Sequence, residues 1–177
     1  MHAATVLRNA GIDVAVFDAM LAPDEHAFRQ SLEAHRPSVV VMFEDNFNFL
    51  SKMCLTRMRE AAITMIGMAR EAGCRVAACG ADVTDHPEVY LAAGAEACFL
   101  GEGEHTMSEV VGTWLGPTPD APIADLAGVA TLVDGQGVSN GRRPIERHPD
   151  VFGLPARDLA EHAARLPVLR AHPVGGA

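Results

Sequence analysis

Two glycines alternate with two glutamates in the segment FLGEGEHT, residues 99–106, directly after a short apolar run. Glycine at a strand-to-helix turn indicates that something approaches the backbone closely. A phosphate cradle is not favoured, because the chain lacks a P-loop lysine motif and the two carboxylates would repel a pyrophosphate. Their simpler role is to complement the dipole of a following helix. The loop therefore predicts either close approach by a neutral or cationic ligand, or only a tight turn.

Three polar or glycine-containing loops follow predicted strands, namely FEDNFNFLS (43–51), CGADVTDHPE (79–88) and LGEGEHT (100–106). In an open parallel sheet, ligands bind outside the carboxyl ends of the strands, where such loops meet. Gly80 and the glycines of the last loop would leave a slot wide enough for a planar group.

Four polar side chains offer donors and acceptors around this slot: Asp45, Asn46, Asp82 and Thr84. For Asp82 and Thr84, a local turn and a helix cap are equally good interpretations.

Other chemistry finds little support in the sequence. The cysteines at 54, 74, 79 and 98 form no C-x-x-C pair, and the eight histidines are scattered, so neither a metal site nor a catalytic residue is predicted. We expect Cys54, Cys79 and Cys98 to be buried, reduced thiols. A phosphoryl-receiver site is weakly supported, since Glu44 and Asp45 could imitate its acidic cluster but Lys52 does not follow a later strand.

The composition limits the class of partner. The chain has 177 residues, with 14 basic and 23 acidic side chains and a formal charge of −9. This balance argues against nucleic acid or an anionic membrane as the main partner. No apolar stretch is long enough to span a bilayer and no export signal is evident, so we expect a cytoplasmic protein.

Helical and strand patterns alternate along the chain. Helices are predicted at 3–10, 26–37, 51–72 and 87–94, with one more that places Met107, Val110, Val111, Trp114 and Leu115 on one face. Strands are predicted at 12–19, 38–44, 74–80 and 95–101. Such alternation is typical of an α/β fold with a doubly wound parallel sheet.

The sequence divides into an α/β domain at 1–115, a Pro-rich linker at 116–125, a β-hairpin at 126–147 and a tail at 148–177. The hairpin is expected to turn at Asp134-Gly135, and the tail to have little independent structure. An open parallel sheet normally begins with a strand, whereas this chain begins inside a helical pattern. We therefore expect that the first strand is missing, either upstream or because the chain is a fragment.

Taken together, LRNAGIDVAVFDA, VVVMFEDN, CGADVTDHPEVYLAAGAEACFLGEGEHTMSEVV, LAGVATLV and FGLPARDL form a recognisable series. Over most of residues 3–160 the chain resembles the N-terminal cobalamin-binding domain of B12-dependent radical S-adenosylmethionine proteins. The resemblance implies a Rossmann-like, flavodoxin-like domain that holds a corrinoid, and with it cobalt, over the strand ends.

Matched to the family pattern by position, and with Asp82 added from the rim of the slot, the expected cofactor-binding residues are Glu44, Asp45, Asn46, Gly80, Ala81, Asp82, Gly101, Glu102, Gly103 and Glu104. Ala81 replaces a second glycine of the family, which would narrow the slot by a methyl group. His86 and His105 lie near the strand ends and are interpreted as loop or cap residues rather than cobalt ligands.

The family's catalytic domain opens with C-x-x-x-C-x-x-C, which this chain lacks. No iron–sulfur cluster or S-adenosylmethionine site is therefore expected, and the chain is not expected to be an enzyme alone. The resemblance implies a radical S-adenosylmethionine catalytic domain or subunit as partner. The alternative is a degenerate interaction or structural domain that keeps the fold without the cofactor.

Overall fold

A computed structural model describes residues 1–43 and 55–159 of the chain, and the account below refers to these residues. The fold is α/β, built on an open five-stranded sheet whose strand order follows the chain, β1-β2-β3-β4-β5. The strands are β1 (Val39–Phe43), β2 (Arg75–Cys79), β3 (Ala97–Phe99), β4 (Val129–Val133) and β5 (Gln136–Ser139). The first three run parallel, and β4 and β5 are antiparallel to their neighbours. The predicted α/β class is confirmed, and the open sheet with its parallel beginning fits a Rossmann-like fold.

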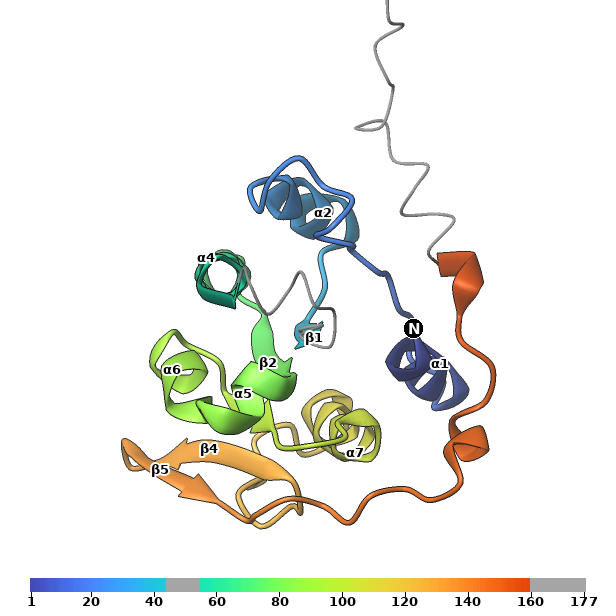
Figure 1. The fold of residues 1–177 in the computed structure, drawn as a ribbon, viewed down its shortest axis with the longest axis vertical. Helices are drawn as coiled ribbons and strands as arrows, with labels where there is room; N and C mark the ends of the chain where they lie inside the picture. The colour runs from blue at the N-terminus through green and yellow to red at the C-terminus, as the bar shows by residue number, and fades with distance from the viewer. Residues whose placement is uncertain (44–54, 160–177) are drawn as a thin grey trace, which may run out of the picture.

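Helices cover both faces of the sheet (Figure 1). They are α1 (His2–Asn9), α2 (Ala27–His35), α4 (Leu55–Glu71), α5 (Ala81–Asp85), α6 (Pro87–Ala92) and α7 (Glu104–Leu115). Buried side chains of α2, α4 and α6 form one apolar cluster, and those of α1 and α7 form the other. Alternate residues of the central strands fill the two clusters, with Val76 and Ala78 on one side and Ala77 and Cys79 on the other. None of the described helices is both long and apolar enough to cross a membrane.

Most predicted helices are confirmed, with local reasons for their ends. Helix α2 ends where Arg36 adopts a left-handed conformation (φ 47°) and Pro37 follows, because proline cannot continue the helical hydrogen bonds. On α7, four of the five predicted apolar residues are buried, whereas Leu115 is 46% exposed. The short helix α5 was not predicted; its residues were expected to form a loop.

The strand predicted at 12–19 is wrong. Residues 12–17 form no strand, and the backbones of 13–17 make no backbone hydrogen bond to any described residue. The segment still alternates as a strand does, since Ile12 and Val14 pack with the α1–α7 cluster and Phe17 packs with the α2–α4 cluster. The side chains thus alternate between the two clusters, but a strand also needs a neighbour with which to exchange hydrogen bonds.

A hairpin forms within the predicted range 126–147, but its strands cover only Val129–Val133 and Gln136–Ser139. It continues the sheet because β4 pairs with β3. Asp134 and Gly135 have φ values of 51° and 76°, as a tight two-residue hairpin turn requires. The start of the tail is more ordered than expected. Phe152, in the short 3-10 helix Pro149–Phe152, is buried, and the carbonyl of Leu154 accepts a hydrogen bond from Thr5 Oγ1 of α1 at 2.7 Å.

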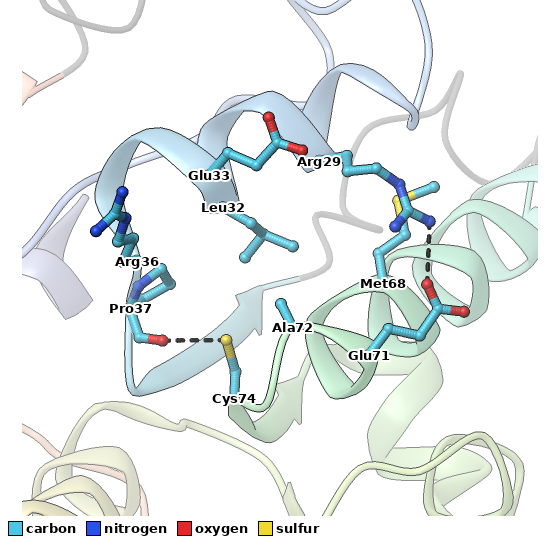
Figure 2. A pocket seen from close by; sticks show the side chains of 9 residues that line it. All are labelled: Arg29, Leu32, Glu33, Arg36, Pro37, Met68, Glu71, Ala72 and Cys74. Atoms are coloured by element: carbon cyan, nitrogen blue, oxygen red, sulfur yellow. Dashed lines mark hydrogen bonds and ion pairs between the residues drawn. The ribbon is translucent and has the colours of Figure 1, made fainter.

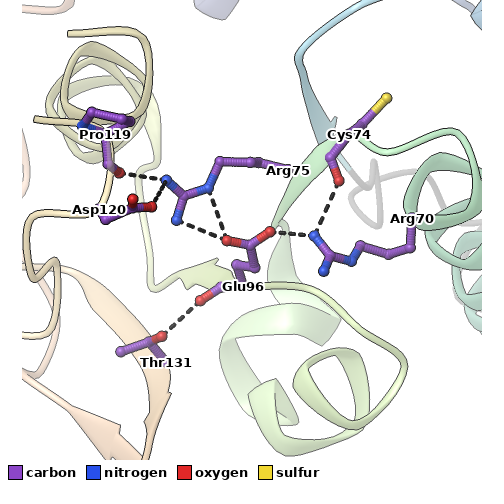
Figure 3. A network of polar contacts seen from close by, with 7 residues as sticks. All are labelled: Arg70, Cys74, Arg75, Glu96, Pro119, Asp120 and Thr131. Atoms are coloured by element: carbon purple, nitrogen blue, oxygen red, sulfur yellow. Dashed lines mark hydrogen bonds and ion pairs between the residues drawn. The ribbon is translucent and has the colours of Figure 1, made fainter. Parts of the chain in front are cut away.

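A polar network ties together the amino-terminal ends of β2 and β3 (Figure 3). The Glu96 carboxylate pairs with Arg75, at 2.8 Å, and with Arg70 of α4. The Glu96 carbonyl accepts a hydrogen bond from Thr131 Oγ1 of β4 at 2.7 Å, and the Arg75 guanidinium lies 4.5 Å from the ring centre of Trp114 in α7. This end of the sheet is occupied by its own side chains, so a ligand site is to be sought at the opposite end.

Candidate functional site

Thr84 joins the loops that follow β2 and β3. Its Oγ1 donates to the Gly80 carbonyl at 2.8 Å and accepts from the Gly101 amide at 3.0 Å. Gly80 (φ 153°) and Gly101 (φ 81°) both adopt conformations that side chains disfavour. Two segments of bare backbone are therefore fixed together at the carboxyl ends of neighbouring parallel strands. We call residues 80–84 and 100–104 the strand-end shelf.

Gly103 does not contribute an open part of this shelf. It is buried, and a Cβ placed on it would lie 2.4 Å from Cys79 Sγ and 3.5 Å from Phe43 Cε1. Its missing side chain makes room for Cys79 rather than for a ligand. The slot expected beside Gly80 is therefore bounded by Gly101, which is exposed.

The Asp82 side chain lies in the interior rather than on the rim. It is only 3% exposed, and its carboxylate accepts two hydrogen bonds from the Arg59 guanidinium, at 2.5 and 2.7 Å, and one from the Tyr90 hydroxyl at 2.6 Å. The hydrogen bonds from Arg59 are the main cause that holds the pKa of Asp82 below its ordinary value. Asp82 thus anchors α5 against α4 and α6, and so holds Thr84 and the shelf in place.

The segment that follows the hairpin strands crosses the shelf, and we call residues 142–152 the strap. The Glu102 carboxylate accepts the Glu146 amide at 3.0 Å, and His105 Nε2 lies 3.4 Å from the Glu146 carboxylate. The His105 ring packs against Phe152, with the ring centres 4.8 Å apart. Hydrogen bonding from the His148 amide, with a further contribution from His105, lowers the pKa of Glu146. The carboxylate of Glu102 and the ring of His105 are thus already engaged within the protein.

The strap also places a positive charge beside the shelf. A Cβ on Gly101 would lie 4.0 Å from Arg142 Cδ, with no nearer neighbour outside the adjoining residues. The Arg142 side chain is 65% exposed, and its guanidinium lies 3.5 Å from the Asp85 carboxylate. The shelf thus has an exposed cation in addition to the carboxylates of Glu102 and Glu104. Ala81, which starts α5, is exposed at the same edge.

The described thiols, of which only Cys79 touches the shelf, are poor nucleophiles. Burial is the main cause that raises the pKa of Cys79 and of Cys98 to about 12, and it also raises the pKa of Cys74. All three are free and buried, which confirms the prediction for Cys79 and Cys98; Cys54 lies outside the described residues.

We expect Cys74, Cys79 and Cys98 to resist alkylation in the folded protein, because the reactive thiolate is scarce and the sulfur atoms are covered. Iodoacetamide treatment near neutral pH, followed by peptide mass spectrometry, measures this. Labelling should rise at least about tenfold once urea unfolds the chain. Rapid labelling of Cys79 in the native protein would mean that the shelf opens readily.

No group of three or more His, Cys, Asp or Glu side chains that could hold a metal ion occurs within 1–43 and 55–159. Glu44, Asp45 and Asn46, expected to border the ligand, and Lys52, weighed for a receiver site, lie outside the described residues. Of the expected site residues, the structure brings together Gly80, Ala81 and Gly101–Glu104. The Asp82 side chain is buried beneath the shelf, where it binds Arg59 and Tyr90.

A hollow of about 540 Å³ opens elsewhere, between α2 and α4 (Figure 2). Leu32, Met68 and Ala72 form part of its wall. Its Arg29 is paired with Glu71 at 3.1 Å, and its Cys74 thiol donates to the Pro37 carbonyl at 3.1 Å. This hollow lies near the amino-terminal ends of β1 and β2, and these side chains already bind one another, so we do not assign it a ligand.

No model of a known protein family matches the chain, and no curated protein matches it at a significant level. Membership of a family therefore stays a prediction from the motifs quoted above. Within the described residues, the shelf offers exposed backbone, the cation of Arg142 and the carboxylates of Glu102 and Glu104.

Proposed function

We propose that this chain binds a cobalamin (corrinoid) cofactor at the carboxyl ends of its parallel strands, as the B12-binding part of a radical S-adenosylmethionine-type methyltransferase or related enzyme. The observation that carries the proposal is the pair of glycines, Gly80 and Gly101, linked through Thr84 at adjacent strand ends. A large planar ligand needs such side-chain-free backbone to approach closely. The motifs supply the identity of the ligand. The open sheet with its parallel beginning fits a Rossmann-like frame, and the resemblance adds the proposal that this frame is flavodoxin-like.

The residues present fit such a group in part. The backbone of Gly80, Ala81, Gly101 and Glu102 is the surface that would hold it, and the exposed Arg142 would face an anionic part of the ligand. Gly103 and Asp82 would not contact the ligand. Gly103 leaves space for the Cys79 side chain, and Asp82 anchors α5. When bound, the corrinoid would supply cobalt-centred methyl-transfer or rearrangement chemistry. The chain's own part is to bind and orient it for a catalytic domain or subunit, and nucleic acid and membrane are not proposed as partners.

The direct test is to mix the purified chain with hydroxocobalamin, remove free ligand by gel filtration, and record the visible spectrum of the protein peak. We expect about one corrinoid per chain, held by the shelf at micromolar affinity or better. A folded monomer that retains no corrinoid would contradict the proposal.

A matched pair of variants locates the site. Gly101→Trp places a large ring on the shelf and should abolish retention of the corrinoid. Gly73→Trp is its control, because Gly73 also has φ 81° and has open space around it, but it ends α4 at the opposite end of the sheet. Each variant carries a similar backbone strain of about 1 kcal/mol, so a difference in retention measures the shelf alone. Equal retention by the two variants would place the corrinoid elsewhere.

A second candidate is an interaction domain without a cofactor. The strap favours it, because the Glu146 amide binds Glu102 and the Phe152 ring covers His105 at the edge where a ligand would sit. In that case hydroxocobalamin would not be retained by the native chain nor by Glu102→Ala, which releases the strap from the shelf. Retention by Glu102→Ala alone would instead show that the strap excludes the ligand.

A further inference from the structure

Strand β5 is the last strand of the sheet, and its outer edge has no partner strand within residues 1–43 and 55–159. All four of its residues are exposed, and it lies at the rim of the molecule (Figure 1). The chain is described on both sides of the hairpin, at 116–128 and at 140–159, and neither stretch adds a strand to this edge. The edge is therefore open to another strand.

The outward backbone groups of β5 belong to Gly137 and Ser139. The Asn140 amide donates to the Val129 carbonyl of β4 at 3.1 Å. In an antiparallel ladder every second residue exchanges hydrogen bonds with a given neighbour, so Val138 also faces β4 and the residues on either side of it do not. The amides and carbonyls of Gly137 and Ser139 point to the open edge.

These outward groups are arranged symmetrically about Val138. When a second β5 runs antiparallel to the first with the two Val138 residues opposite each other, Gly137 of each copy faces Ser139 of the other. Such a pair exchanges two hydrogen bonds and uses no group of the β4–β5 ladder. Val138 then occupies the position without hydrogen bonds, where opposite Cα atoms lie about 4.5 Å apart and side chains pack closely.

The apolar side chains of the hairpin fit the same arrangement. Val138 is 39% exposed and Val133 of β4 is 43% exposed. They lie on one face of the sheet, because Thr131 is opposite Val138 and stands two positions before Val133. Pairing about Val138 brings the two Val138 side chains together, with a Val133 beside each, and so removes apolar surface from water.

The charges at the two ends of the strand are complementary. Residues 136–139 carry no charge, whereas Asp134 stands four positions before Val138 and Arg142 four positions after it. An antiparallel pair centred on Val138 therefore brings Asp134 of each copy to the end where Arg142 of the other lies. Arg142 is 65% exposed and its present contact with Asp85 is 3.5 Å long, and exchanging such a surface pair costs little.

We propose that the outer edge of β5 is an interface between two copies of this chain, which pair antiparallel about Val138 and join their sheets into one. A second copy fits because it supplies the backbone groups, the apolar side chains and the charges in matching positions. The strand is short and the formal charge of −9 opposes association, so we expect a weak dimer with a Kd on the order of 100 micromolar. The pairing does not depend on the proposed corrinoid, and its tests use the chain alone.

Sedimentation velocity on the purified chain measures the pairing directly. Between about 10 and 500 micromolar, we expect the sedimentation coefficient to rise from that of a monomer towards that of a dimer, as a Kd of this order requires. A chain that stays monomeric at about 500 micromolar would overturn the proposal.

A matched pair of variants tests the backbone contacts. Gly137→Pro removes an outward amide that β4 does not use, so it should keep the hairpin and raise the Kd of the dimer at least about tenfold. Gly137→Ala is its control, because it keeps the amide and a Cβ there meets nothing within 4 Å. It should associate as the native chain does. Equal association of the two variants would contradict the proposed edge.

A cysteine pair tests the register even if Gly137→Pro fails to fold. Val138→Cys places the thiols of two copies opposite each other, at a Cα separation of about 4.5–5.5 Å that suits a disulfide. Gln136→Cys is the control, since it lies on the same strand and face but stands opposite Asn140 of the other copy. The native chain gives the background, and its cysteines at 74, 79 and 98 are buried.

Oxidised glutathione links two such thiols by exchange and leaves two molecules of reduced glutathione. On a non-reducing gel we expect Val138→Cys to give at least about ten times more linked dimer than Gln136→Cys or the native chain. Equal linkage through positions 136 and 138 would show that the copies do not pair about Val138, and would overturn the proposed interface.

Discussion

Replacing Asp82 by asparagine should lower the free energy of unfolding by about 3 kcal/mol, because breaking a buried ion pair leaves its partner without compensation. The Asp82 side chain is 3% exposed and Arg59 is 29% exposed. Asparagine keeps the shape and one acceptor oxygen but removes the negative charge. Urea unfolding followed by circular dichroism near neutral pH gives the difference.

The control for this substitution is Glu71→Gln. Glu71 pairs with Arg29 at 3.1 Å, but the two side chains are 67% and 52% exposed, and exposed pairs contribute less than about 1 kcal/mol. If Asp82→Asn cost no more than Glu71→Gln, the buried network would not be a source of stability.

The same variant has a predicted pH signature. Because Arg59 lowers the pKa of Asp82 below its ordinary value of 3.8, the carboxylate stabilises the folded state above that value. This contribution is lost as the pH falls through the lowered pKa of the folded protein. The difference in stability between the native chain and Asp82→Asn should stay constant down to about pH 5 and shrink below about pH 4. A difference that grew on acidification would have the wrong sign.

Gly103→Ala is expected to cost about 2 kcal/mol, because its methyl group would meet Cys79 Sγ in a packed interior. Gly103 has φ −91°, a conformation open to alanine, so the cost is one of space and not of backbone strain. Thermal and urea unfolding measure it. Gly112→Ala is the control, since Gly112 lies inside α7, the helix that Gly103 precedes, and has nothing near its Cβ position. Alanine there should stabilise the chain by about 0.5–1 kcal/mol.

A double mutant tests the cause directly. Cys79→Ala removes the sulfur atom and should cost about 1 kcal/mol alone. Combined with Gly103→Ala, the new methyl group takes the space that the sulfur left, so the pair should cost at least about 1 kcal/mol less than the sum of the single changes. Strict additivity would mean that the two residues do not share that space.

Local patterns allowed most elements to be predicted. The β-branched run before Phe43, the apolar spacing of α7 and the Asp134-Gly135 turn each depend on neighbours in sequence. The strand predicted at 12–19 fails for a non-local reason, since pairing depends on another segment. At the site, the sequence indicated Gly80 and Gly101 but not what surrounds them.

The roles of Gly103 and Asp82 could not be read from the sequence. Gly103 admits a side chain from β2, and Asp82 binds Arg59, which lies 23 positions before it. The sequence indicated the bridging role of Thr84 only weakly, through its position four residues after Gly80. The sequence did not indicate the strap, because its contact between Glu146 and Glu102 joins residues that are 44 positions apart.

The sequential order of the strands has a consequence for assembly. Each strand from β2 to β5 pairs with the strand that precedes it in the chain, so the sheet can grow in the order of synthesis, with each new strand adding to the one made just before it. The main exception is the closure of the tail on α1, where Thr5 meets Leu154 at a separation of 149 residues and Arg8 meets Asp158 at 150. These contacts are on the surface, so we expect this closure to form last and to open first.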